Sequence, residues 1–164
     1  MKRLWVIRHA KTANPRGVED FDRPLAERGE ADATLVKAWL AAQAHPATYV
    51  VTSPALRARQ TANAVKDAFG IADDALVEEP SLYMASPETI VDAARAVPDV
   101  IESLAIVGHN PGMTYVANLL GNAPSTGNLP TFGVVVFSFA GAWRDLAFGT
   151  CDWLAAITPK QLRP

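Results

Sequence analysis

A short, wholly apolar segment near the start of the chain most constrains what this sequence can fold into. Residues 4–7 read Leu-Trp-Val-Ile, and they are followed at once by Arg8 and His9. Four consecutive apolar residues are typical of a strand that is buried on both faces, as in a parallel sheet. In open α/β sheets, ligands bind just beyond the carboxyl ends of the strands. An arginine there can bind an anion, and an imidazole can act as a nucleophile or proton carrier. A strand that ends in an ordinary polar loop is the alternative interpretation.

The rest of the sequence alternates strand-like segments with segments of helical period, which predicts an α/β fold. The predicted strands are residues 3–7, 49–52, 75–78, 104–107, 134–139 and 144–148. Apolar residues at helical spacing lie between them, around Leu35–Leu40, Leu56–Phe69, Ile90–Val97 and Met113–Leu120. We therefore expect a three-layer α/β/α sandwich with a mixed, mostly parallel sheet.

The last two predicted strands differ from the others because a short connection that contains Ala140-Gly141-Ala142 joins them. This spacing favours an antiparallel hairpin at or near one edge of the sheet. Two long irregular segments, residues 11–24 and 122–130, are expected to be loops. Loops of this length in a compact domain tend to be functional or disordered.

Composition limits the class of protein. A length of 164 residues suits a single domain spanning residues 1–164. The net charge of −2 argues against a nucleic-acid partner, which usually requires a basic patch. The single cysteine, Cys151, excludes an internal disulfide and a cysteine-cluster metal site. No apolar stretch approaches membrane-spanning length, and residues 4–7 are too short for the core of a signal peptide. We expect a cytoplasmic protein with no membrane partner.

Two other predicted strands are also followed by an arginine or a histidine. The strand at 49–52 is followed by Ser53-Pro54 and then Arg57, and the strand at 104–107 by His109 and Asn110-Pro111. Serine and asparagine are favoured helix N-caps and proline suits the first helical position, so a helix should begin at each place. Helix N-termini carry free N–H groups and a partial positive charge, which favour bound anions.

If the three strands are parallel neighbours, Arg8, His9, Arg57 and His109 meet at one edge of the sheet. Cationic and cationizable groups so close together repel one another unless an anion lies between them, and a tetrahedral phosphate fits this role. A zinc site built from His9, His109 and an aspartate is an alternative, but the two arginines would repel the metal. We therefore predict no metal and no cofactor. Taken singly, Arg57 also fits a helix surface and His109 a loop.

These residues resemble the signatures of the histidine phosphatase superfamily, also called the phosphoglycerate mutase-like fold. The family pattern is a first strand ending in Arg-His-Gly, then Ser-Pro-x-x-Arg-Ala-x-x-Thr-Ala, then a late Gly-His. This chain has Arg-His-Ala at 8–10, Ser-Pro-Ala-Leu-Arg-Ala-Arg-Gln-Thr-Ala at 53–62 and Gly-His-Asn-Pro at 108–111. The small size and the Asp-Arg-Pro-Leu segment at 22–25 are similar to the SixA-like branch, which includes phosphohistidine phosphatases.

The resemblance implies a role for each matching residue. His9 would be the nucleophile that takes the phosphoryl group, and its other ring nitrogen should donate to a backbone carbonyl or a similar acceptor. Arg8 and Arg57 would bind the nonbridging oxygens. His109 would donate to the same group, most usefully as the imidazolium, and Asn110 would help to bind the substrate.

The sequence departs from the family pattern at two points. Ala10 stands where the family has glycine, which matters only if that backbone needs a positive φ or contacts phosphate directly. Larger members also place a glutamate general acid after the second motif, but residues 80–85 contain no carboxylate. Glu79 and Glu88 flank this stretch, and Asp20 and Asp22 are alternative proton donors. A surface or turn position is the simpler interpretation of Glu79, Glu88 and Asp22.

A missing acid carries chemical information, because a sugar alkoxide needs a proton as it leaves and an imidazole needs one far less. The leading hypothesis is therefore a phosphatase for phosphohistidine in a protein partner, and the alternative is a small-molecule phosphatase of the same mechanism. A noncatalytic phosphoprotein-binding module is a third possibility. A protein partner should require an exposed apolar rim, for which Tyr83, Met84 and Trp143 are candidates, although core packing explains them more simply. A metabolite should require a deep, closed pocket.

Overall fold

A single six-stranded sheet, with the strand order β3-β2-β4-β1-β5-β6, organises the protein. The computed structural model describes residues 1–122 and 127–164, so part of the loop predicted at 122–130 lies outside the described residues. Strands β3, β2, β4 and β1 pair in parallel, whereas β5 pairs antiparallel with both β1 and β6. The strands are β1 (Lys2–Arg8), β2 (Tyr49–Thr52), β3 (Leu76–Glu78), β4 (Ser103–Gly108), β5 (Val134–Phe139) and β6 (Asp152–Ile157).

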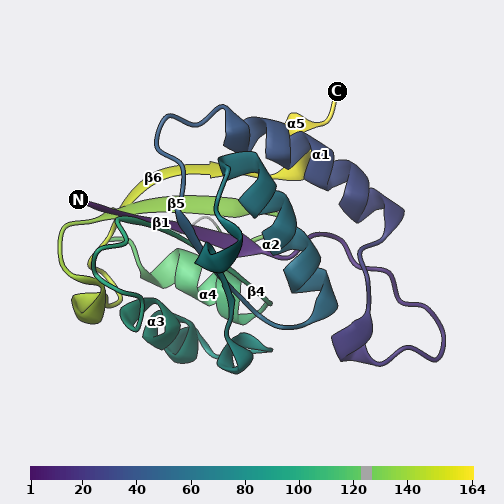
Figure 1. Cartoon of the computed structure of the whole chain (residues 1–164), viewed down its shortest axis with the longest axis horizontal. Helices are drawn as coiled ribbons and strands as arrows, with labels where there is room; N and C mark the ends of the chain where they lie inside the picture. The colour runs from purple at the N-terminus through teal and green to yellow at the C-terminus, as the bar shows by residue number, and fades with distance from the viewer. Residues whose placement is uncertain (123–126) are drawn as a thin grey trace.

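Helices cover both faces of this sheet, which confirms the predicted three-layer sandwich (Figure 1). On one face lie α1 (Glu27–Ala41), α2 (Leu56–Phe69) and the short α5 (Pro159–Leu162). On the other face lie α3 (Pro87–Arg95) and α4 (Gly112–Leu119). Strand β1 serves both layers, because Trp5 and Ile7 pack on the first side and Leu4 and Val6 on the second. None of the described helices is long and apolar enough to cross a membrane.

The predicted strand at 144–148 is wrong. Trp143–Asp145 forms a short 3-10 helix instead, and the chain pairs with β5 only later, as β6. The cause is the side chain of Trp143, which is fully buried and whose indole nitrogen donates to the carbonyl of Ile101 at 2.6 Å. The backbone N–H of Trp143 also donates to Asp99 at 3.0 Å. These anchors hold the segment against the body of the protein. An edge strand antiparallel to β5 exists, as expected, but different residues form it.

The register of the sheet brings the ends of four strands to one edge. Arg8 pairs with Gly108 and Thr52 with Val107, so β1, β2 and β4 end side by side. Backbone bonds continue past these ends, from His9 N to the carbonyl of Gly108 and from Ser53 N to the carbonyl of Val107, both at 3.0 Å. On the other side, Ile7 pairs with Val134, which pairs with Ile157. The carboxyl end of β6 therefore lies at the same edge as that of β1.

The two ends of the long loop after β1 pair with each other. Thr12 forms a bridge with Leu25, and the N–H of Ala26 donates to the carbonyl of Lys11 at 2.9 Å. Gly29 on α1 lies against the same carbonyl, because a Cβ at this position would be 2.1 Å from the oxygen of Lys11. The close contact between α1 and this loop fixes where residues 13–24 emerge.

Replacing Gly29 by alanine is expected to destabilise the protein by about 1–3 kcal/mol, because the added methyl group must push the Lys11 backbone away from α1. Urea unfolding followed by circular dichroism measures this free energy. Thr34→Ala, at an exposed position of the same helix, is the control and should change it by less than about 0.5 kcal/mol. Equal stability of the two variants would show that the loop does not depend on this contact.

Candidate active site

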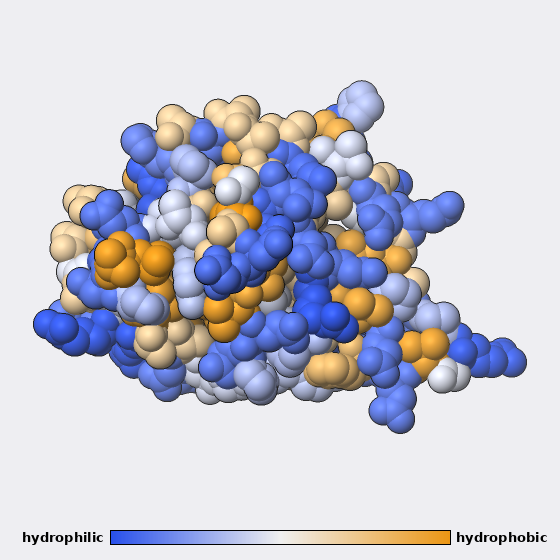
Figure 2. Space-filling view, viewed as in Figure 1, coloured by the Kyte–Doolittle hydropathy of each residue, from blue (hydrophilic) through white to orange (hydrophobic). Residues whose placement is uncertain are grey.

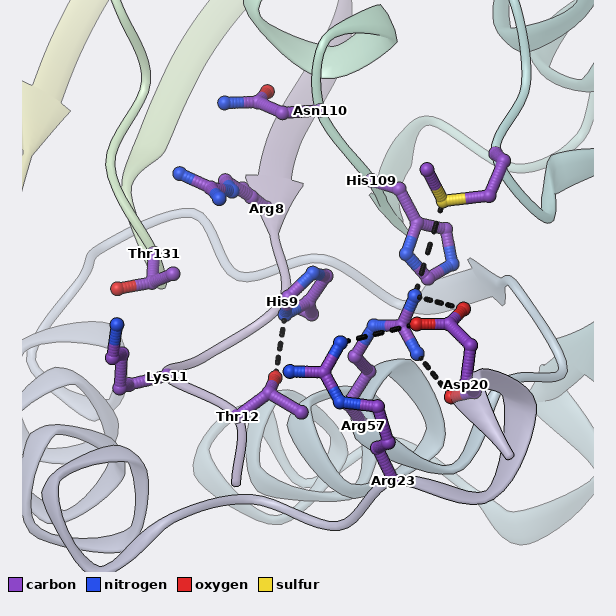
Figure 3. A pocket seen from close by; sticks show the side chains of 11 residues that line it. Arg8, His9, Lys11, Thr12, Asp20, Arg23, Arg57, His109, Asn110 and Thr131 are labelled. Carbon is purple, nitrogen blue, oxygen red and sulfur yellow. Dashed lines mark hydrogen bonds and ion pairs between the residues drawn. The ribbon is translucent and has the colours of Figure 1, made fainter. Parts of the chain in front are cut away.

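The predicted residues meet in one pocket of about 260 Å³ at this edge of the sheet (Figure 3). Arg8 ends β1, His9 follows it, Arg57 lies in the first turn of α2, and His109 and Asn110 follow β4. The structure thus brings together all five residues that the sequence placed at the phosphoryl site. The pocket is lined by Arg8, His9, Lys11, Thr12, Asp20, Arg23, Arg57, Met84, His109, Asn110 and Thr131.

His9 is held in a single tautomer. Its Nδ1 lies 2.8 Å from the carbonyl oxygen of Ala10 and 3.2 Å from the hydroxyl of Thr12. A carbonyl can only accept, so Nδ1 carries the proton and Nε2 is left with a free lone pair. Burial lowers the pKa of His9 to about 4, and the positive charges of Arg57 and Arg8 act in the same direction, although the Ala10 carbonyl opposes them. At neutral pH the ring is therefore uncharged and nucleophilic.

Ala10 fits where the family pattern has glycine. Its side chain is fully buried in the core beneath the site, and its N–H donates to the hydroxyl of Thr61 at 2.9 Å. Among the described residues, the non-glycine positions with a positive φ are Met84 and Phe132, so Ala10 has an ordinary backbone conformation. The methyl group therefore adds to the core without straining the chain.

The two arginines lie on opposite sides of His9 (Figure 3). Arg57 is only 3% exposed, and it donates to the backbone carbonyl of Asp20 at 2.7 Å and to the carboxylate of Asp20 at 3.0 Å. Arg8 donates from one terminal nitrogen to the carbonyl of Leu129 at 3.1 Å. Its Nε is buried and has no hydrogen-bond partner among the described residues. Burial lowers the pKa of Arg8.

His109 faces His9, with 5.2 Å between the ring centroids. Its Nε2 lies 2.7 Å from the hydroxyl of Ser53, while Nδ1 is buried and has no partner in the described part of the chain. The pKa of His109 is lowered to about 3, mainly by burial, and positive charges near the ring, that of Arg57 among them, act in the same direction. In the free protein this ring is neutral, whereas the sequence suggested an imidazolium. The difference arises first because burial removes the ring from water, and second because the neighbouring arginines are cationic.

Asp20 is the acidic side chain that lines the pocket. Besides Arg57, its carboxylate accepts from Arg23 at 3.1 Å and from the hydroxyl of Tyr83. The hydrogen bond from Tyr83, together with those from Arg57 and Arg23, holds the pKa of this carboxyl far below its usual range. Asp20 is therefore a carboxylate at any working pH. It orients Arg57 in the free protein but has no proton to give.

The other proposed proton donors lie away from the pocket. Asp22 is exposed at the end of a short 3-10 helix, and Glu88 is exposed in the first turn of α3. The carboxylate of Glu79 accepts from the N–H of Ser81 at 2.9 Å, where it caps a 3-10 turn. None of the three lines the site. The structure therefore brings Asp20 to the pocket and leaves Asp22, Glu79 and Glu88 outside it.

The helices begin slightly later than the sequence suggested. Helix α2 begins at Leu56, and the hydroxyl of Ser53 accepts from the N–H of Ala55 at 3.3 Å while it also contacts His109. Helix α4 begins at Gly112, and the side-chain oxygen of Asn110 accepts from the N–H of Thr114 at 3.0 Å. Each predicted cap residue therefore accepts from a backbone N–H near a helix start, while Ser53 contacts His109 and Asn110 lines the pocket.

Sequence reasoning missed Lys11, Thr12, Arg23 and Thr131 as pocket residues. Arg23 belongs to the Asp-Arg-Pro-Leu segment that contributes to the family resemblance. Its place in this segment is the signal that could have identified it as a site residue. The described lining of the pocket therefore has a single carboxylate, that of Asp20, and four basic Lys and Arg side chains. These are Arg8, Lys11, Arg23 and Arg57. In a protein of net charge −2, this local excess of positive charge selects for an anionic ligand.

Comparisons with known proteins agree with this geometry. A family model described as histidine phosphatase superfamily (branch 1) matches residues 4–82. An uncharacterized protein of Mycobacterium tuberculosis is 37% identical over 163 residues, which cover 94% of this chain and all of that protein. The chain belongs to the histidine phosphatase superfamily.

Solved structures of this superfamily resemble the chain over nearly its whole length. A structure described as putative phosphohistidine phosphatase SixA from Nakamurella multipartita has a TM-score of 0.81 at 29% identity, covering 96% of both chains. A protein histidine phosphatase SixA complexed with tungstate has a TM-score of 0.83 at 21% identity, covering 98% of this chain and 99% of that one. The phosphoglycerate mutase-like fold of this histidine phosphatase superfamily member is thereby confirmed.

The protonation state of His9 can be tested directly. In the anion-free protein we expect the ring to stay neutral until the pH approaches its pKa of about 4, instead of titrating near the ordinary 6.5. Nitrogen NMR of the imidazole side chains measures both the pKa and the tautomer, with a His109→Gln variant to assign the signals. Added tungstate should raise the pKa of His109, since a bound anion offsets the neighbouring positive charges. Titration of His9 near 6.5 would contradict the assigned environment.

Proposed function

We propose that this protein is a phosphatase that transfers a phosphoryl group to His9 and then hydrolyses the phosphohistidine formed, and that its substrate is phosphohistidine in a protein partner. The observation that carries the proposal is the fixed tautomer of His9, which leaves Nε2 unprotonated in a pocket lined by two arginines. Binding alone does not require an aligned nucleophile, so this feature favours an enzyme over a noncatalytic module.

In the first step Nε2 of His9 attacks the phosphorus, and the bond from phosphorus to the leaving nitrogen of the substrate breaks. Arg8 and Arg57 bind the nonbridging oxygens and offset the charge that develops on them. Nε of Arg8 and Nδ1 of His109, which have no partner in the described part of the protein, are additional donors once the phosphoryl group is bound. Because Asp20 already binds Arg57, the incoming dianion competes with this carboxylate for the same guanidinium group.

In the second step a water molecule attacks the phosphorus of the phosphorylated His9. The bond between phosphorus and Nε2 breaks, inorganic phosphate is released, and the ring recovers its free lone pair. The Ala10 carbonyl keeps the proton on Nδ1 throughout, so the ring needs no tautomer change between turnovers. The same arginines stabilise both transition states because the phosphoryl oxygens keep their positions.

The absence of a usable acid favours a phosphoramidate substrate. Asp20 is ionised, and Asp22, Glu79 and Glu88 lie outside the pocket. An alkoxide leaving from a sugar phosphate would need a proton that none of these groups supplies. A phosphohistidine ring protonated on its other nitrogen leaves as neutral imidazole, so it needs no proton from the protein. The chemistry of the leaving group thus matches the side chains that are present.

The surroundings of the pocket suit a protein partner. Met84 lines the pocket and is 54% exposed, and Phe21 is 39% exposed and packs on Tyr83 with 5.3 Å between the ring centroids. Together they form an exposed apolar rim beside the entrance, as expected for a docking surface. Trp143, the other rim candidate, is buried in the core. The names of the SixA structures also point to phosphoprotein substrates. A cytoplasmic location remains a prediction from the sequence.

A substrate screen tests the proposal. The purified protein is assayed for phosphate release from a phosphohistidine peptide, an aryl phosphate and several sugar phosphates. We expect the highest kcat/KM for the phosphohistidine peptide, intermediate values for the aryl phosphate and the lowest values for the sugar phosphates. Turnover of sugar phosphates alone would favour the small-molecule alternative and refute the leaving-group argument. Binding of the peptide without turnover would favour the noncatalytic module.

A further inference from the structure

A second cavity adjoins the phosphoryl pocket and belongs to no step of the proposed reaction. Its volume is about 270 Å³, and Thr131 lines both cavities. The register of the sheet explains the proximity, because the carboxyl end of β6 lies beside the start of β5 at the edge where β1 ends. We call this second cavity the α5 groove; it is lined by Pro130, Thr131, Thr158, Pro159, Lys160 and Arg163.

The lysines of the chain fall into two groups. Lys2, Lys37 and Lys66 each form an ion pair with an aspartate. Among the described residues, Lys11 and Lys160 have no carboxylate within ion-pair distance, and they line the phosphoryl pocket and the α5 groove, respectively. The two unpaired ammonium groups therefore belong to adjoining cavities, and Figure 3 shows Lys11 pointing toward Thr131 on the side of the pocket away from Arg57.

The floor of the α5 groove is firmly held. Arg163 binds both carboxylate oxygens of Asp32, at 2.8–3.1 Å, and Asp32 is buried on α1. Thr158 and Gln161 form a capping box that fixes the start of α5. Because Asp32 neutralises Arg163, Lys160 carries the unbalanced charge among the described residues that line the groove, and none of these residues is acidic. On the face of the whole molecule that Figure 2 shows, hydrophilic side chains cover most of the surface, and smaller apolar groups lie between them.

We propose that the α5 groove, with Lys160 along it and Lys11 in the adjoining pocket, binds an acidic side chain that flanks the phosphorylated residue of the partner. This inference rests on the proposed function, since the phosphorylated residue enters the first cavity while the adjoining chain crosses Thr131. The phosphoryl group satisfies Arg8 and Arg57, so the two lysines are left for a second anion. The substrate is then an acidic phosphohistidine segment.

Two peptides with the same phosphohistidine test the groove. One carries glutamates on both sides of the phosphorylated residue, and the other carries glutamines. The readout is the ratio of their kcat/KM values. We expect wild type to favour the acidic peptide, Lys160→Gln to lower this ratio by about twofold to fivefold, and Lys11→Gln/Lys160→Gln to lower it further. Lys37→Gln, which removes a lysine on α1 away from both cavities, should keep the wild-type ratio.

Salt gives an independent readout, because raising the ionic strength should lower the wild-type ratio more than the ratio of Lys160→Gln. An unchanged ratio in Lys160→Gln would overturn the proposal. The proposal would also be overturned if Lys160→Gln lowered kcat/KM for small phosphorylated carboxylates but not for the acidic peptide. That result would assign the groove to metabolites.

A binding measurement distinguishes an error in the proposed enzymatic function from an error in the proposed role of the α5 groove. If neither peptide is hydrolysed, the proposed function fails, and the groove is judged by binding. Fluorescence anisotropy then measures the Kd of the two peptides for His9→Ala and for His9→Ala/Lys160→Gln. A preference for the acidic peptide that Lys160→Gln reduces supports the groove, and equal Kd ratios in the two proteins refute it.

Discussion

Replacing His9 by alanine is expected to lower kcat/KM for every hydrolysed substrate by about 10⁴-fold or more, because the variant lacks the unprotonated Nε2 that attacks the phosphorus in the proposed mechanism. Lys11, Arg8, Arg23 and Arg57 are cationic donors, and His109 uses Nε2 to contact Ser53. Steady-state phosphate release from the peptide and the aryl phosphate measures the loss.

A matched substitution separates chemistry from folding. His9→Asn retains a polar side chain at this buried position, and it should be as inactive as His9→Ala if the lone pair of the imidazole is what matters. Circular dichroism and the Tm of both variants verify that the fold is intact. His45→Ala, at an exposed position far from the pocket residues, is the control and should keep wild-type activity. Substantial turnover by folded His9→Ala would show that the nucleophile is another group.

The second large effect is expected at Arg57. Arg57→Ala should lower kcat/KM by about 10²–10³-fold, the cost of removing one preorganised donor group from a transition state. Most of the loss should appear in kcat, because the charge on the phosphoryl oxygens grows as the bond to the leaving group breaks. Arg57→Lys should recover only part of it, since an ammonium group cannot bind two oxygens as a planar guanidinium does.

Arg59 provides the control for this prediction. It lies two residues further along α2 and donates from Nε to the carbonyl of Pro54 at 2.9 Å, but it does not line the pocket. Arg59→Ala should change kcat/KM by no more than about twofold to threefold. Because Arg57 also binds Asp20, the stability of Arg57→Ala is measured in parallel by urea unfolding. An Arg57→Ala enzyme with wild-type kcat would contradict the assigned role.

The sequence predicted the centre of the site because that centre depends on short-range patterns. Buried strands read as apolar runs, and residues just after their carboxyl ends must meet when the strands are parallel neighbours. The ends of β1, β2 and β4 obey this rule, because the pairs Arg8–Gly108 and Thr52–Val107 align the three strand ends, so that the residues following them lie at one edge of the sheet. The tautomer of His9 was expected from the family resemblance and the nucleophilic role that it implies, and only the structure identified Ala10 as the acceptor.

The parts that could not be predicted depend on contacts between distant segments. Asp20 reaches Arg57 and Tyr83 because the loop after β1 folds over α2, and no local pattern encodes this fold. The apolar residues of 144–148 suggest a strand, but the burial of Trp143 and its hydrogen bond to the carbonyl of Ile101 override this preference. Because the last strand was predicted at 144–148, no pattern pointed to residues 158–163 as part of a binding site, so the α5 groove and Lys160 were missed.

The central claim is that His9 carries the phosphoryl group during turnover, and trapping this intermediate tests it most directly. The protein is mixed with excess phosphohistidine peptide, quenched in alkali within the first turnover, digested and mapped by mass spectrometry. We predict an acid-labile, alkali-stable phosphate on the peptide that contains His9, and no such adduct in His9→Ala. A phosphate on any other residue, or turnover by wild type with no phosphorylated protein at any quench time, would contradict the mechanism.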